Sequence, residues 1–213
     1  MKNIPMFTTE FGVASLILEE IPYKKIGYIK IQSSATPEWF LNECVDFCKA
    51  IGAEQIYASG HEYLRSYPLY TEILRLECEK AIIEPGNLEV RWIDESTVQL
   101  WCDVYNRQMH DVPNAATLLA EKVKKLIPDR VCCLLYEKER LLGIGKLDDD
   151  KVDAIASVVP GRGADVMRAL CGCISGDKVV VEVAATNIPA MRLYNKLGFQ
   201  KVETISTWYC VNK

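Results

Sequence analysis

Residues 186–202 read TNIPAMRLYNKLGFQKV, which we interpret as a helix that runs into a strand. Three apolar residues recur at the spacing of one helix face: Ala190, Leu193 and Leu197. Gly198 is a common helix stop, and Phe199 begins a new apolar run. Packing against a sheet accounts for these positions. It does not account for the amide of Asn187 or the phenol of Tyr194, so these two are candidate functional groups.

The pattern after residue 86 is that of a mixed sheet with helices on its faces. Pro85-Gly86-Asn87 indicates a boundary, so we expect an N-terminal lobe over 1–85 and a second domain over 86–213. Asp94 and Asn114 are expected to cap two successive helices. The expected elements follow in this order: strand 88–93, helix 94–106, helix 114–126, strands 131–137, 140–148 and 151–159, helix 163–174, strand 178–185, helix 188–197, and one or two strands within 201–212.

The first lobe has a weaker pattern. Two apolar runs predict a hairpin, and Thr36 followed by Pro37 is a good helix start. The predicted order is β-β-α-β-α, from these segments: strands 11–18 and 26–31, a helix from 37 to 51 that Gly52 ends, strand 54–59 and helix 67–76.

Composition excludes several classes of function. The 213 residues carry 25 Lys and Arg against 29 Asp and Glu, a formal charge of −4, which lacks the basic excess that nucleic-acid binding requires. No apolar run approaches the ~18 residues that cross a bilayer, so we expect a cytoplasmic protein with no membrane partner. Nine cysteines without a Cys-x-x-Cys pair, and only two histidines, favour reduced buried thiols and no metal site. We expect a monomer or a homodimer.

A glycine-rich segment precedes the helix expected at 163–174. Residues 158–170 read VVPGRGADVMRAL. Gly161 and Gly163 allow a tight turn whose backbone N–H groups point at one place before a helix N-terminus, which favours a phosphate. A simple turn explains the same residues.

The order of elements and the opening segment together resemble the GCN5-related N-acetyltransferase superfamily. In that family an Asn-x-x-Ala-x-x-Leu-Tyr-x-x-x-Gly-Phe segment borders the pantetheine arm and thioester of acetyl-coenzyme A. This sequence carries every position of the motif: Asn187, Ala190, Leu193, Tyr194, Gly198 and Phe199. The resemblance implies a mixed, largely antiparallel α/β sheet with helices on both faces, and acetyl-coenzyme A as co-substrate.

The family's phosphate loop, Gln/Arg-x-x-Gly-x-Gly/Ala, is altered here. Pro160 replaces the leading Gln or Arg, and Asp165 replaces the final small residue. Asp165 adds a negative charge beside the expected diphosphate unless it turns outward or caps the helix. Either cofactor binding is weakened, or Arg162 and Arg168 compensate. The resemblance implies these cofactor contacts: Val158, Val159, Gly161, Arg162, Gly163, Ala164, Asn187 and Tyr194.

The implied reaction is direct attack of a primary amine on the acetyl thioester. A backbone N–H around Val158 would stabilise the oxyanion, and Tyr194 would donate a proton to the departing thiolate. Glu182, a carboxylate on an apolar strand, is the first candidate for the base, and Asp153 is the second. A structural ion pair with a neighbouring Arg or Lys is the alternative for Glu182.

The acceptor pocket is expected at residues 105–112, YNRQMHDV, between the first two helices of the second domain. Tyr105 and Met109 would form walls, and His110 and Asp111 would meet an ammonium group. A solvated loop is the alternative.

Two further questions stay open at the level of sequence. The first lobe is either a shrunken, non-catalytic copy of the acetyltransferase half or an unrelated cap that shapes the acceptor site. The protein is either an active N-acetyltransferase on a small amine, amino acid or peptide, or a catalytically silent regulator that binds an acyl-coenzyme A or a protein partner.

Overall fold

The computed structural model describes residues 5–212, which form two compact units. Unit 1 consists of two segments, the chain up to Ile73 and the chain from Thr204 onward, and unit 2 is Leu74–Glu203. Strand β5 (Leu69–Glu79) starts in one unit and ends in the other. Gly86 has a packing role within unit 2, since a Cβ there would lie 2.4 Å from the backbone nitrogen of Ala169.

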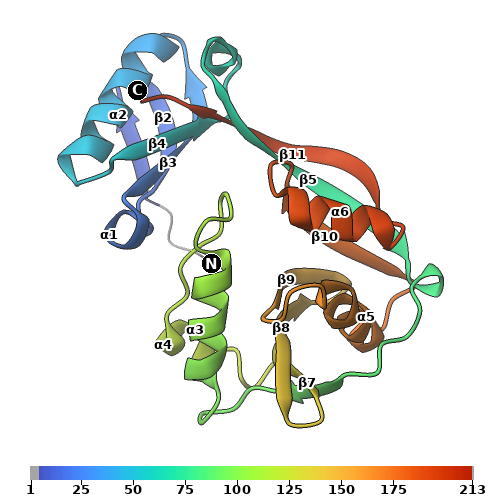
Figure 1. Ribbon diagram of the computed structural model, residues 1–213. Coiled ribbons are helices and arrows are strands. Elements are labelled where there is room, and N and C mark those ends of the chain that lie inside the picture. The colour runs from blue at the N-terminus through green and yellow to red at the C-terminus, as the bar shows by residue number, and fades with distance from the viewer. Residues whose placement is uncertain (1–4, 213) are drawn as a thin grey trace. The chain divides into compact units, whose positions relative to one another are not determined.

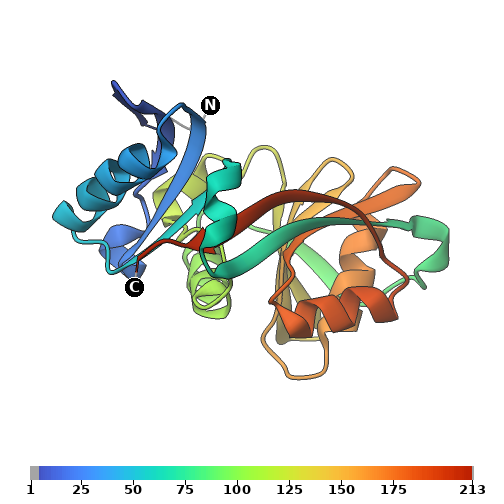
Figure 2. The same ribbon diagram turned by 90° about the horizontal axis from the view of Figure 1, so that it is seen from above.

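Unit 2 contains a mixed sheet in the strand order β11-β5-β10-β9-β8-β7-β6. Strands β5 and β11 are neighbours and run side by side in Figures 1 and 2. Its elements, besides parts of β5 and β11 (Gln200–Cys210), are these: the 3-10 turn η2 (Lys80–Ile82), β6 (Glu89–Trp92), α3 (Val98–Met109), α4 (Ala120–Lys124), β7 (Cys132–Glu137), β8 (Arg140–Asp148), β9 (Lys151–Ser157), α5 (Gly163–Cys173), β10 (Lys178–Ala184) and α6 (Ile188–Lys196).

Helices cover both faces of the unit 2 sheet. Helix α5 packs close on β8 because two strand residues have no side chain: a Cβ on Gly143 would meet Val166, and one on Gly145 would lie 2.2 Å from Leu170. Helix α3 lies on the other face, where the Trp101 indole donates hydrogen bonds to two backbone carbonyls of the sheet at 3.1 and 3.2 Å. The expected fold class is therefore confirmed.

The second helix of unit 2 is shorter than expected. We predicted helix 114–126, but α4 spans only Ala120–Lys124. Asn114 has φ +61°, a left-handed conformation that does not suit a helix N-cap. Asn106 fixes the preceding segment instead, because its amide both donates to the Leu118 carbonyl and accepts from the Leu118 N–H, each at 2.8 Å.

Unit 1 contains the expected hairpin, helix and third strand, with β3 and β4 parallel across five residue pairs. Its elements, besides parts of β5 and β11, are these: β1 (Met6–Thr9), β2 (Gly12–Ile17), α1 (Ile21–Lys24), β3 (Ile26–Ser34), α2 (Pro37–Ala50), β4 (Gln55–Ser59) and the 3-10 turn η1 (Glu62–Ser66).

The helix predicted at 67–76 was wrong, because this segment belongs to β5. Burial along β5 alternates, with Leu74, Leu76 and Cys78 buried and the residues between them more exposed. That period of two is the period of a strand. Local helix propensity of its Glu, Leu and Arg residues is overridden by sheet pairing.

Candidate active site

Strands β9 and β10 are neighbours in the unit 2 sheet but pair over only part of their length, and we call the unpaired stretch the opening. They pair in parallel only where Lys151 faces Val180 and Val152 faces Val181. Both strands continue beyond that point, β9 to Ser157 and β10 to Ala184. We call the point where this pairing ends the apex of the opening.

The glycine loop lies between β9 and α5. Gly161 has φ +80°, which glycine adopts easily, and a Cβ placed on it would meet nothing within 4 Å. Gly163 begins α5 and faces Leu193 of α6, whose Cδ2 would lie 3.3 Å from an added Cβ. Val159 and Ala164 are partly buried against the core. The loop therefore leaves open space at Gly161, directly before a helix N-terminus.

Charged side chains near this loop are already paired. The Arg162 guanidinium binds Asp165 and, at 2.8 Å, Glu137. Arg168 lies 3.6 Å from Asp165 and 3.5 Å from Glu84. Hydrogen bonds from Arg162 hold the pKa of Glu137 below its usual value. Asp165 is thus paired with both arginines, but two guanidiniums serve three carboxylates.

Asn187 has a structural role that the sequence pattern did not show. It is the N-cap of α6, and its Oδ1 accepts a hydrogen bond from the Ala190 N–H at 3.3 Å. The amide thus satisfies one of the donors that a helix N-terminus leaves unpaired. Our statement that packing leaves Asn187 unexplained was wrong.

Tyr194 lies in the core of unit 2. Its ring is 5.5 Å from that of Phe199, and the residue is 5% exposed. Burial raises the pKa of the Tyr194 phenol, and the nearby thiol of Cys171 raises it further. The phenol is therefore protonated at neutral pH, so it is a proton donor and not a base.

The backbone N–H of Val158 is already engaged. It donates to the Leu142 carbonyl of β8 at 2.9 Å, so it points away from the opening. N–H groups of successive strand residues point to opposite edges, and those of Ser157 and Val159 are expected to face the opening instead. Of the N–H groups expected around Val158 as oxyanion donors, that of Val158 itself is therefore already occupied.

Both candidate bases stand at the apex, one residue past the last pair. Asp153 follows Val152 on β9, and Glu182 follows Val181 on β10. Glu182 is not buried, and it forms ion pairs with Lys151 at 3.0 Å and with Arg75 at 3.5 Å.

The alternative that we gave for Glu182, a structural ion pair, is therefore realised.

Asp153 is held in its charged form by two lysines. Burial of Asp153 opposes its ionisation, but Lys146 and Lys151 hold the pKa of Asp153 below its usual value.

The three expected acceptor-site residues differ in their surroundings. Tyr105 belongs to α3, is buried, and stacks on Trp101 with ring centroids 5.2 Å apart. Met109 ends α3 and packs against the same cluster. His110 is exposed and pairs with Asp111 at 2.8 Å.

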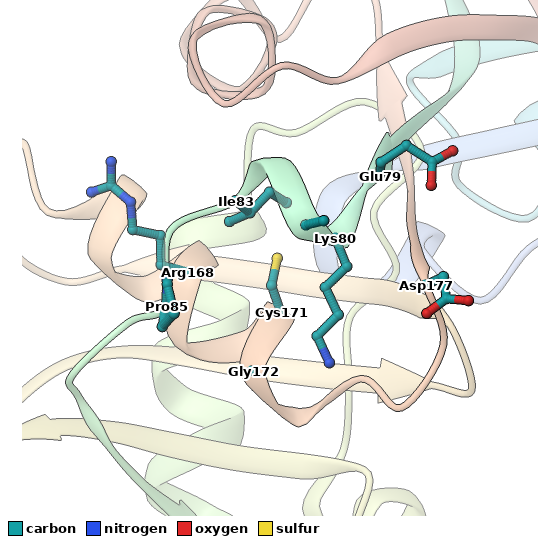
Figure 3. A pocket seen from close by; sticks show the side chains of 9 residues that line it. Glu79, Lys80, Ile83, Pro85, Arg168, Cys171, Gly172 and Asp177 are labelled. Carbon is teal, nitrogen blue, oxygen red and sulfur yellow. The ribbon is translucent and has the colours of Figure 1, made fainter.

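A cavity of about 680 Å³ lies at the other end of α5 from the glycine loop. In Figure 3 the Cys171 thiol points into it between Ile83 and Lys80. Burial raises the pKa of that thiol to about 12, so it is protonated at neutral pH. The Cys171 thiol is therefore a poor nucleophile at neutral pH.

Solved structures provide the comparison that decides the fold. An acetyltransferase of the GNAT family from Colwellia psychrerythraea is 10% identical, with TM-score 0.53 over 97% of this chain and 84% of that one. A GCN5-related N-acetyltransferase from Anabaena variabilis is 9% identical, with TM-score 0.60 over 95% and 60%. The chain has the fold of the GCN5-related N-acetyltransferases.

A third similar structure is that of a conserved protein of unknown function from Staphylococcus epidermidis. It is 12% identical, with TM-score 0.60 over 99% of this chain and 94% of that one. No protein-family model and no curated protein matches the sequence. None of the helices among the described residues is long and apolar enough to cross a membrane.

The sequence analysis did not identify three charged residues that lie beside the apex of the opening: Arg75, Lys146 and Lys151. Arg75 was assigned to a helix, and the two lysines lie on strands where exposed charges are common. Only the cross-strand register places them together with Asp153 and Glu182. The sequence carries no signal that would have found them.

Proposed function

We propose that the protein is an N-acetyltransferase that transfers an acetyl group from acetyl-coenzyme A to a primary amine. The observation that carries this proposal is the β9–β10 opening, which has the open glycine loop at one end and two carboxylates at its apex. The acetyltransferase fold supports the general class of reaction.

The diphosphate of the co-substrate would lie against the loop before α5. The backbone N–H groups of Gly161 and Gly163 would bind it, since that of Arg162 already donates to the Val159 carbonyl at 3.2 Å, and the space at Gly161 fits a group that approaches the backbone closely. Arg162 would exchange Glu137 or Asp165 for a phosphate, because an exposed ion pair of this kind is weak and exchanges readily.

The amine would enter from the sheet face that α3 covers. Val179, Val181 and Val183 pack in the core beside α5 and α6, so Glu182 points to the opposite face. The ionised carboxylates of Asp153 and Glu182 would attract an ammonium group and accept its proton, directly or through water.

Tyr194 would then protonate the leaving thiolate. The N–H groups of Ser157 and Val159 would stabilise the oxyanion that forms on the thioester carbonyl. A thiol has a reference pKa of about 8.5 against about 10 for a phenol, and the raised pKa of Tyr194 makes the transfer still more demanding. Proton donation would therefore be a slow step.

The test is release of free coenzyme A thiol from acetyl-coenzyme A across a panel of amines. We expect amine-dependent thiol release that follows protein concentration. An absence of release with every amine, despite a folded protein, would contradict the proposal.

A second candidate is a catalytically silent regulator that binds an acyl-coenzyme A or a protein partner. The paired charges around Arg162 favour it, since an incoming diphosphate must displace existing carboxylates. Binding of acetyl-coenzyme A without thiol release would support this candidate over the enzyme.

A further inference from the structure

Six charged side chains cross the unit 2 sheet as an alternating row, which we call the charge ladder. Its members, in strand order from β11 to β8, are Glu203, Arg75, Glu182, Lys151, Asp153 and Lys146. The first four contacts measure 2.8, 3.5, 3.0 and 3.2 Å, and Lys146 completes the row by binding Asp153. Five neighbouring strands each contribute at least one rung.

The ladder passes through the apex of the β9–β10 opening. Its central members, Glu182, Lys151 and Asp153, border the last paired residues of the two strands. Lys146 faces Ala154, which packs in the cluster beneath α3. Glu182 also points away from α5 and α6. The ladder therefore lies on the sheet face from which we propose that the amine enters.

The ladder is accessible and contributes little to stability. Its side chains are 23% to 50% exposed, a range in which ion pairs add only a small net free energy. The Nε of Arg75 is buried and donates no hydrogen bond within the described residues, so the hydrogen-bonding capacity of this guanidinium is not fully used. Charges of this kind can exchange an internal partner for a ligand at low cost.

Charge balance restricts what such a row can bind. Three cations and three anions alternate, so a ligand with several positive charges is repelled at every second position. A ligand that carries one charge of each sign matches the row, because each of its charges can lie beside a ladder member of the opposite sign.

We propose, on the basis of the proposed function, that the acceptor is a free amino acid. Its ammonium group binds Asp153 and Glu182 at the apex, and its carboxylate binds Arg75 and Lys151. Arg75 selects the carboxylate with a planar guanidinium, which suits that group better than an ammonium does. The ladder thus separates amino acids from simple amines and polyamines.

The experiment compares matched acceptors. Common α-amino acids are each assayed beside their carboxamides, which keep the amine and lose the negative charge. Thiol release gives kcat/KM for each member of a pair, and calorimetric titration gives its affinity without any turnover. The variants are Arg75→Gln, the conservative Arg75→Lys, and Arg91→Gln, which removes an equally exposed arginine that binds Glu89 outside the ladder.

We expect at least one amino acid to exceed its carboxamide about tenfold or more in kcat/KM, as loss of a charged hydrogen bond predicts. Arg75→Gln lowers that ratio towards one, Arg75→Lys retains part of it, and Arg91→Gln leaves it unchanged. Thermal unfolding of the variants confirms that each is folded.

Equal turnover of acids and amides would overturn the ladder proposal and leave the acetyltransferase proposal intact. Calorimetric preference for the amino acid without any thiol release would support the ladder and contradict catalysis. Equal loss of the ratio in Arg75→Gln and Arg91→Gln would also overturn the role of Arg75, since Arg91 does not touch the ladder.

Discussion

Substitution of Gly161 by alanine should have two effects that can be measured separately, one on the stability of the protein and one on its affinity for acetyl-coenzyme A. Gly161 has φ +80°, a conformation that costs an L-residue roughly 1–2 kcal/mol. An added Cβ meets no atom within 4 Å, so no steric term adds to that cost. Gly161→Ala should therefore lower the unfolding free energy by about 1 kcal/mol, or the melting temperature by about 2–4 °C for a chain of this size.

The same methyl group projects into the space that we propose for a diphosphate, so affinity for acetyl-coenzyme A should fall by about tenfold or more. Gly52→Ala is the matched control, because Gly52 has φ +97° and its added Cβ would have only an ordinary contact, 3.8 Å from Ile21. Thermal unfolding and calorimetric titration measure both effects. Equal affinity of the two variants for the co-substrate would refute the placement of the diphosphate.

Three further predictions concern single side chains of unit 2. Tyr194→Phe keeps the ring packing against Phe199 and should lower kcat by about 100-fold or more with no loss of melting temperature; a fall in stability with unchanged kcat would mean that the phenol only packs. Asn187→Ala should cost about 0.5–2 kcal/mol of unfolding free energy in denaturant titration, and a neutral result would contradict its role as a cap. Ionised Asp153 stabilises the folded state above its unfolded pKa of about 3.9, and this contribution disappears as the pH falls through the lower folded pKa. Asp153→Asn should therefore destabilise the protein slightly at pH 7, as expected of partly exposed ion pairs, and less at pH 3; the same loss at both values would exclude the ion pairs as the cause.

Much of unit 2 was predictable because its signals are local. Glycine turns and apolar runs predicted the bounds of the strands from β6 to β10 and of the helices α5 and α6 to within a few residues. The segment 67–76 was not predictable in this way, because the long pairing of β5 is decided by strands far along the chain. That error also hid Arg75, which only a strand places beside Glu182.

The candidate site was predicted in its parts more than in its geometry. The loop at Gly161 and the motif around Tyr194 can be recognised from residue types and spacing. Which edge of β9 the N–H of Val158 faces depends on register, and a shift of one residue reverses it. The pairing of Glu182 with Lys151 likewise depends on which strands are neighbours, which sequence spacing does not encode.

The most direct test of the account is a crystal structure of the protein with acetyl-coenzyme A. The diphosphate should lie at the N–H groups of Gly161 and Gly163, and the thioester between β9 and β10, within reach of Tyr194. Co-substrate bound instead in the cavity beside Cys171, with the loop before α5 empty, would contradict it.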